Sequence, residues 1–100
     1  MKNLRAKWYT FQIGKRQFQV KAEPEGECRY MVRMSELDAK GLLVPHRANL
    51  RIGYLTGRAQ SWLAEYFGTH PSTPAATARA ACMAIAIWAE QRHGFQEMPL

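Results

Sequence analysis

The sequence lacks the features that mark several large classes of protein. No apolar run approaches the roughly 20 residues that a membrane-spanning helix needs, although 47% of its 100 residues are hydrophobic. The first residues, MKNLRAKWY, contain no apolar centre and no cleavage site of a secretory signal peptide. We therefore expect a cytoplasmic protein that makes no contact with a membrane and folds as a single domain over residues 1–100.

Cysteine and histidine are too few and too scattered for a metal site. Zinc needs about four ligands, usually in local pairs, whereas this chain has only Cys28, Cys82, His46, His70 and His93. A disulfide between the two cysteines would need an oxidising compartment, and nothing in the sequence points to one. We expect two buried thiols, no metal and no cofactor.

Signatures of catalysis are missing as well. The segment GYLTGR at residues 53–58 lacks the length and the closing Gly-Lys-Ser/Thr of a phosphate-binding loop. Ser61 stands in no Gly-x-Ser-x-Gly elbow and has no identifiable base beside it, and His46 is a lone histidine after a proline. A cluster of carboxylates is typical of a solvated turn: Glu23, Glu25 and Glu27. The expectation is a protein that is not an enzyme.

Acidic residues are absent from the first 22 positions. This segment holds six of the 14 bases, and residues 23–100 balance eight bases against eight acids, so the net charge of +6 comes from the N-terminal segment. Its bases are Lys2, Arg5, Lys7, Lys15, Arg16 and Lys21. A basic segment of this kind attracts nucleic acid or an acidic protein surface. The alternative is a solvated surface that keeps the chain soluble.

Alternation of apolar and polar residues predicts a β-hairpin in this basic segment. Residues 7–13 and 16–22 form its strands, and Gly14-Lys15 forms a two-residue turn. The inward side chains are Tyr9, Phe11, Ile13, Phe18, Val20 and Ala22. The outward side chains are Lys7, Gln12, Gln17, Gln19 and Lys21, with Lys15 and Arg16 at the tip.

A third strand is expected over residues 28–34, after a turn that contains Pro24 and Gly26. One side of this strand carries Cys28, Tyr30, Val32 and Met34, and the other carries Arg29, Met31 and Arg33. A short helical turn should follow near residues 36–40, because Ser35-Glu36-Leu37-Asp38 resembles a capping sequence.

The middle of the chain predicts a connector and a second hairpin. Residues 42–50 form the connector, which Pro45 interrupts. Residues 51–68 form the hairpin, with its turn at or near Thr56-Gly57. The whole order gives an α+β fold, an antiparallel sheet of four to five strands with one long C-terminal helix packed on one face and the short helical turn near residues 36–40.

The long C-terminal helix has a clear start and a clear end. Ser72 or Thr73 can cap its free N–H groups, and Pro74 suits the first helical position. Cationic side chains suit its last turn at Arg92 and His93, and the next residue is a glycine that can take the left-handed cap conformation.

This helix carries two apolar stripes at about 100° per residue. The stripe expected to face the sheet comprises Ala78, Ala81, Cys82, Ile85, Trp88 and Ala89. The second stripe comprises Ala76, Ala80, Met83 and Ile87. It packs either under the connector or the C-terminal tail, or it forms a partner or self-association face that would make the protein a homodimer instead of a monomer.

The outward residues of the first hairpin suit nucleic acid as a partner. A β-ribbon can enter the major groove, where Arg, Lys and Gln contact base edges and phosphates. The candidate contacts are Lys7, Gln12, Lys15, Arg16, Gln17, Gln19, Lys21, Arg29 and Arg33. The element order is loosely similar to that of the DNA-binding domains of phage integrases, from which the inserted residues 35–71 depart.

The C-terminal third resembles a different group of proteins. Residues 62–88, WLAEYFGTHPSTPAATARAACMAIAIW, run from a strand with a Trp through a Gly and Thr/Pro turn into an Ala-rich helix. This pattern is similar to the ending of small phage and prophage accessory proteins, including some phage anti-CRISPR inhibitors. The resemblance implies an inhibitor that occupies a surface of a host protein or ribonucleoprotein complex, such as a CRISPR-type defence system. Many such inhibitors are acidic imitations of nucleic acid, whereas this chain is basic.

Two hypotheses of function follow. In the first, the protein inhibits a host complex, with the basic hairpin steering association and exposed aromatics such as Trp8 or Tyr54 anchoring the contact. In the second, the same hairpin binds DNA. Met83 and Ile87 are the candidate interface residues of the helix.

Overall fold

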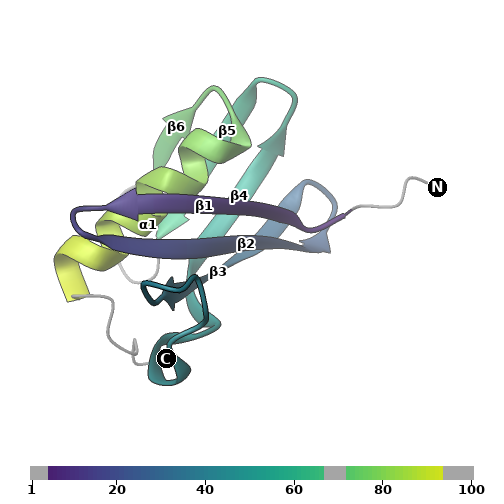
Figure 1. The fold of residues 1–100 in the computed structure, drawn as a ribbon. Coiled ribbons are helices and arrows are strands. Elements are labelled where there is room, and N and C mark those ends of the chain that lie inside the picture. The colour runs from purple at the N-terminus through teal and green to yellow at the C-terminus, as the bar shows by residue number, and fades with distance from the viewer. Residues whose placement is uncertain (1–4, 67–71, 94–100) are drawn as a thin grey trace.

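The structure is a computed structural model that describes residues 5–66 and 72–93 (Figure 1). These residues form an α+β fold with a six-stranded antiparallel sheet and one long α-helix. The elements in chain order are β1 (Lys7–Ile13), β2 (Arg16–Gly26), β3 (Arg29–Leu37), the 3-10 helix η1 (Pro45–Arg47), β4 (Leu50–Arg58), β5 (Ser61–Tyr66), β6 (Thr73–Ala75) and α1 (Ala78–His93). No helix in the described ranges is long and apolar enough to cross a membrane.

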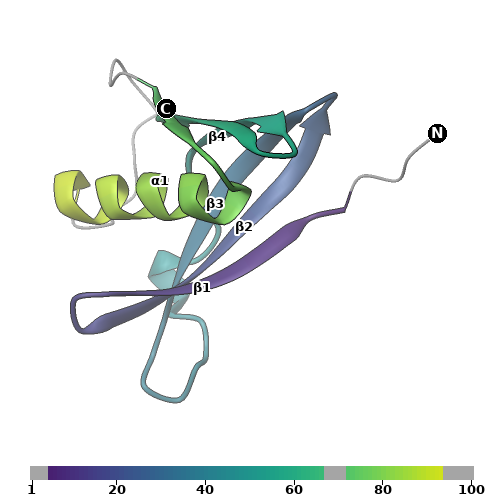
Figure 2. The same ribbon diagram turned by 90° about the horizontal axis from the view of Figure 1, so that it is seen from above.

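The sheet is a simple meander that curls around the helix. Its strand order is β1-β2-β3-β4-β5-β6, and each strand pairs antiparallel with its neighbour in sequence. Figures 1 and 2 show α1 lying against the concave face, with β1 on one side of it and β5 and β6 on the other. The helix therefore fills the inside of the sheet, and the convex face of the sheet is the outside of the molecule.

The first hairpin forms as the sequence predicts. Gly14 has φ 63° and Lys15 keeps a negative φ, which is the geometry of a two-residue II′ turn. The pairs from Lys7 with Ala22 to Ile13 with Arg16 place the expected inward side chains on the helix side. At the tip, Arg16 forms ion pairs with Glu36 and Glu90, at 3.9 and 3.6 Å, which join the hairpin to β3 and to α1.

Small side chains on α1 bring the helix close to the sheet. The fully buried helix residues are Ala81, Cys82, Ile85, Ala86 and Ala89, and their counterparts on the strands include Phe18, Val20, Val32, Ile52 and Leu55. On β4, a Cβ added to Gly53 would lie 2.3 Å from the carbonyl oxygen of Glu65 and 3.1 Å from a methyl group of Ile85. The close approach of helix and strands thus depends on residues with little or no side chain.

The strand count is six, and the expected four to five was wrong because of residues 73–75. Thr73 and Ala75 pair with Ala64 and Trp62 of β5, so the expected helix cap is a short edge strand. Pro74 is tolerated at an edge because its missing N–H has no partner to lose. The helix begins at Ala78 instead, where the hydroxyl of Thr77 accepts a hydrogen bond from the N–H of Ala80 at 3.0 Å.

The expected helical turn at residues 36–40 is also absent. β3 continues to Leu37, which pairs with Gln17 of β2. Asp38 then organises a turn, because its Oδ1 accepts hydrogen bonds from the N–H groups of Lys40 and Leu42, both at 2.9 Å. The helical turn lies further along the chain, in η1.

The second hairpin turns later than expected. β4 runs to Arg58, and the turn is at Ala59-Gln60, where Ala59 has φ 55° and accepts a hydrogen bond from the indole N–H of Trp62 at 2.9 Å. Gly57 is inside β4, with φ 141°, and a Cβ there would lie 2.2 Å from the carbonyl oxygen of Ser61. Gly57 therefore allows the backbones of β4 and β5 to approach closely. The sequence alone had suggested that this glycine forms the turn.

The two cysteines differ in burial. Cys82 is fully buried under the sheet, as expected. Cys28 is only half-buried, because β3 begins at Arg29 and leaves Cys28 in the preceding turn with φ 58°. The expectation of a buried thiol was therefore wrong for Cys28.

Candidate protein-binding face on the outside of the sheet

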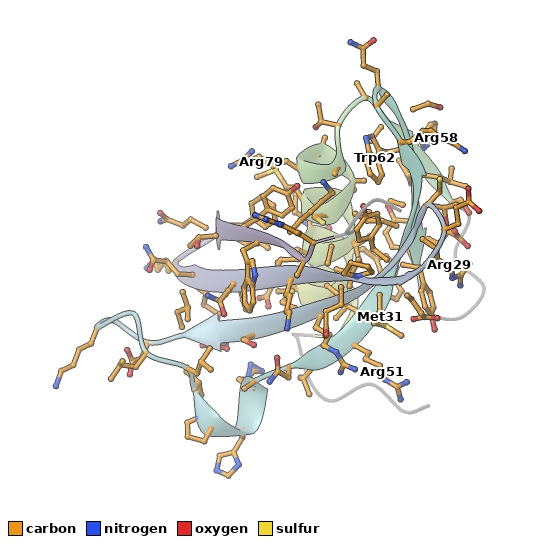
Figure 3. All side chains as sticks on the ribbon, turned by 90° about the vertical axis from the view of Figure 1, so that its right-hand side faces the viewer. Arg29, Met31, Arg51, Arg58, Trp62 and Arg79 are labelled. Atoms are coloured by element: carbon orange, nitrogen blue, oxygen red, sulfur yellow. The ribbon has the colours of Figure 1, made fainter. Side chains whose placement is uncertain are left out.

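The strand register assembles one polar and aromatic surface on the convex side of the sheet. The first row across the strands is Trp8, Lys21, Arg33 and Arg51. The second row is Glu23, Met31, Tyr54 and Glu65, and the third is Arg29, Thr56, Leu63 and Pro74. We call these twelve residues the outer face. Figure 3 shows Arg29, Met31 and Arg51 on the side of the sheet away from α1.

A basic side chain lies over each of the two aromatic rings of the outer face. The Nζ of Lys21 lies 4.8 Å from the ring centroid of Trp8, and the guanidinium carbon of Arg29 lies 4.1 Å from that of Tyr54. These are cation–π distances. Trp8 is 55% exposed, the highest value for an aromatic side chain among the described residues. A large apolar ring therefore stands on the surface with a lysine ammonium group over its face.

Acidic residues neutralise most of the cations on this face. Glu23 accepts a hydrogen bond from Nε of Arg33 at 2.8 Å and lies 3.5 Å from Nζ of Lys21. Glu65 lies 3.9 Å from Arg29 and accepts a short hydrogen bond from the hydroxyl of Thr56.

The outer face keeps one cation without an acidic partner. Its four bases, Lys21, Arg29, Arg33 and Arg51, exceed its two acids, so four minus two leaves a charge of +2. Within the described ranges, Arg51 forms no ion pair. Arg51 is therefore the base of this face that can neutralise an incoming carboxylate without first giving up a partner.

Apolar groups lie between the charged ones. Met31 sits in the middle row and is only 8% exposed, and Leu63 on β5 is 37% exposed. A shallow hollow beside Met31 is lined by Glu23, Pro24, Glu25, Met31 and Arg33. The outer face thus combines an exposed Trp ring with a hollow that is lined in part by a methionine.

The structure brings together most of the candidate residues predicted from the sequence. The convex side of the sheet carries Trp8, Gln12, Gln17, Gln19, Lys21, Arg29, Arg33 and Tyr54. Sequence reasoning missed Arg51, whose place on this side follows from the irregular register between Val32 and Arg33, where β3 pairs with β4. No local signal in the sequence fixes that irregularity.

Other predicted residues lie elsewhere. Lys7 is on the helix side, because it shares the two-residue period of Tyr9, and its Nζ is 5.6 Å from the ring centroids of both Tyr30 and Trp62. The expectation that Lys7 points outward was therefore wrong. Arg16 is held by the ion pairs at the hairpin tip, and Lys15 is exposed in the turn.

The helix candidates are remote from the outer face. Met83 and Ile87 are half-buried residues of α1, on the concave side of the sheet. Met83 packs partly against the core. The connector residues Leu42 and Leu43 are exposed at 62% and 47%, so these two leucines do not cover the second stripe. The C-terminal tail, the other cover expected for it, lies outside the described residues.

The described part of the chain offers no metal centre, since it contains no group of three or more His, Cys, Asp or Glu side chains that could hold an ion. Comparisons with protein-family models, with curated proteins and with solved structures gave no match to this chain.

Proposed function

We propose that this protein is a non-catalytic binding domain that docks its outer face on the surface of another protein. The observation that carries the proposal is the exposed ring of Trp8 with Tyr54, Met31 and three arginines on one face of the sheet. Trp, Tyr, Met and Arg are the residue types enriched at protein interfaces, and Trp, Tyr and Arg dominate their energetic hot spots.

The state of the cations favours protein over nucleic acid as the partner. Phosphate binding draws on lysines and arginines that are free to replace counterions. In the basic hairpin, Lys7 lies over two aromatic rings, Arg16 pairs with Glu36 and Glu90, and Lys21 lies between Glu23 and Trp8. Three of the four hairpin bases that suggested DNA binding therefore already have partners within the chain, and among the described residues Lys15 is the exception.

The remaining charge indicates the chemistry of the partner. Arg51 has no acidic partner in the described residues, and the outer face keeps a charge of +2. An acidic protein surface with an apolar pocket for Trp8 is complementary to it. In its specific form the proposal is inhibition of a host complex by surface occupation, and for this form the support is the resemblance of residues 62–88 to phage inhibitors.

The first test compares capture of proteins from bacterial lysates by variants of the chain. Replacing Trp8 with Ala or Arg51 with Glu should reduce the recovery of a partner at least about tenfold, because hot-spot residues contribute 2 kcal/mol or more. The matched control is Lys40→Glu, which makes the same charge change as Arg51→Glu but in the exposed turn after Asp38. If the Trp8 and Arg51 variants keep the partner as well as the Lys40→Glu variant does, the outer face is not the interface.

The second test measures binding to labelled single- and double-stranded DNA at about 50 and 200 mM salt. A protein that makes several phosphate contacts loses orders of magnitude in affinity over this range. We expect no such tight, salt-sensitive binding. If it is found, and if Lys15→Glu weakens it, the DNA-binding alternative replaces the proposal.

A further inference from the structure

The sheet has two edges, and they differ in what they can bind. β6 is three residues long with Pro74 at its centre, and proline has no N–H to donate. β1 is seven residues long and contains no proline, and within the described chain no strand pairs with its outer side. A long open edge without proline is a template for another strand. Natural proteins usually block such an edge, and β1 carries only Lys7 as a blocking charge.

The turn geometry determines which backbone groups of β1 are open. In a two-residue II′ hairpin the residues that flank the turn, here Ile13 and Arg16, form a hydrogen-bonded pair. Bonding then alternates along an antiparallel strand. Phe11, Tyr9 and Lys7 are therefore bonded to β2, whereas the intervening residues turn their N–H and C=O groups outward.

The three outward residues are Trp8, Thr10 and Gln12. All three are exposed. Within the described ranges, none of them takes part in a backbone hydrogen bond outside the strand ladders. The edge thus presents three donor and acceptor pairs in a row, at the spacing that an antiparallel strand needs.

We propose that the open edge of β1 takes up an extended segment of a partner protein that carries acidic residues near both ends. The edge is uncharged from Trp8 to Gly14, and Arg5 and Lys15 flank it, both of them exposed and without an ion pair in the described residues. An added segment whose ends lie opposite these two bases gains from acidic residues at both ends.

A second copy of this chain fits the edge less well. Antiparallel pairing centred on Thr10 would place Arg5 opposite Lys15 of the second copy, at both ends of the seam. Parallel pairing in register would place Lys7 beside its own equivalent. Like charges directly opposite each other destabilise a strand pair. The charges of the edge therefore favour an acidic strand of another protein over a second copy of this chain.

The side chains beside the edge add a further requirement. On the helix side, an added strand would meet the half-buried Tyr9, whose ring stacks at 5.9 Å on that of the buried Phe11, and the exposed Arg79, whose guanidinium carbon lies 5.1 Å from the Phe11 ring centroid. Apolar residues at alternate positions of the added strand suit the Tyr9 ring. This contact goes beyond the docking of the outer face, because it uses the backbone of β1.

The probe is the synthetic peptide acetyl-ETVTVTVTVTE-amide, which spans Arg5 to Lys15 when it pairs antiparallel with β1. Amide hydrogen exchange of the full chain is followed residue by residue by NMR as the peptide is added. We expect the N–H groups of Trp8, Thr10 and Gln12 to exchange at least about tenfold more slowly, and those of Tyr9 and Phe11 to change little, because they already bond to β2. Unchanged exchange at Trp8, Thr10 and Gln12 would overturn the proposal.

Two controls test the charge and the occupant. The peptide with lysine in place of both glutamates should give much weaker protection, and equal protection would show that the acidic ends play no part. Protection of the same three N–H groups in the absence of peptide, rising with protein concentration, would show instead that a second copy occupies the edge.

A substitution separates this edge from the outer face. Thr10→Pro removes only the outward N–H donor at the centre of the edge, and it should abolish the peptide-induced protection at Trp8 and Gln12 while the chain stays folded. Thr10→Ala keeps the donor and should retain the protection. Arg51→Glu should also retain it, so that a failure of the edge and a failure of the outer face are distinguished.

Discussion

Residues of the same type have different roles in this protein. Lys7 and Lys21 both belong to the basic hairpin, yet Lys7 lies over Tyr30 and Trp62 on the helix side and Lys21 lies over Trp8 on the outer face. The difference is a matter of alternation along a strand, since odd and even positions point to opposite faces. A net charge of +6 therefore does not describe a single basic surface.

Cys82 shows how burial changes the chemistry of one side chain. Burial raises its pKa from 9.0 to about 12, and the positive charge of Lys7 opposes this with a smaller effect. We expect Cys82 to resist thiol reagents at about pH 8 until the chain unfolds, and the half-buried Cys28 to react in the folded protein. Counting thiols labelled with and without denaturant measures this, and rapid labelling of both in the folded state would contradict it.

The same shift predicts how stability depends on pH. The pKa of Cys82 is higher in the folded chain than in the unfolded chain, so the unfolded chain releases the thiol proton first as the pH rises. The contribution of the protonated Cys82 to the free energy of unfolding is therefore complete below about pH 9 and is lost as the pH rises towards 12. The free energy of unfolding should therefore fall more steeply above about pH 9 in the native protein than in Cys82→Ala. Urea unfolding at several pH values compares the two slopes.

At the scale of elements, the start of α1 depends on a cap that is not the expected one. The hydroxyl of Thr77 accepts a hydrogen bond from the N–H of Ala80, and its carbonyl accepts one from Ala81 at 3.1 Å. The expected caps at positions 72 and 73 lie before the helix, and Thr73 is part of β6. Each helix end needs partners for its free N–H groups, and here Thr77 supplies the first.

We predict that Thr77→Ala lowers the free energy of unfolding by about 1 kcal/mol, because one N–H at the helix start loses its side-chain acceptor. Thr77→Ser keeps the hydroxyl and should have a much smaller effect. Urea denaturation followed by circular dichroism gives both values. Equal stability of the Ala and Ser variants would mean that this hydrogen bond does not support the helix.

At the scale of the whole molecule, the helix is the inner part of the core and the curled sheet is its wall. Ile85 is fully buried and lies next to Gly53 of β4, whereas Ile87 is half-buried on another side of α1. Contacts between the helix and β1, β2, β4, β5 and β6 mean that most of the sheet is stabilised through α1. A cavity under the helix should therefore affect the entire fold.

We predict that Ile85→Ala lowers the free energy of unfolding by about 2–5 kcal/mol, because it removes buried methyl groups and leaves a cavity that the packed strands cannot fill. Ile87→Lys should cost far less and leave the fold intact. Urea unfolding and the far-ultraviolet spectrum measure both. If Ile87→Lys unfolds the chain, the second apolar stripe belongs to the core and does not form a partner or self-association face.

The sequence by itself determined the local elements of this protein. The turn at Gly14, the residues that share a face of the first hairpin, the α+β class and the position of most of α1 follow from periodicity and turn chemistry, because these signals act between residues close in the chain. Which face of that hairpin meets the helix did not follow from them. The same periodicity could have shown that Lys7 lies on the side of Tyr9 and Phe11. The candidates Trp8, Lys21, Arg33 and Tyr54 could be named from the sequence as exposed or basic residues.

Tertiary structure alone decided how these pieces combine. Residues 73–75 form a strand only because β5 offers an edge to pair with, and Arg51 joins the row of Trp8 and Arg33 only because the register between β3 and β4 is irregular. Which cations are already neutralised depends on Glu23 and Glu65, which the curled meander brings beside them. Pairing across strands joins residues far apart in sequence, and no local pattern specifies its register.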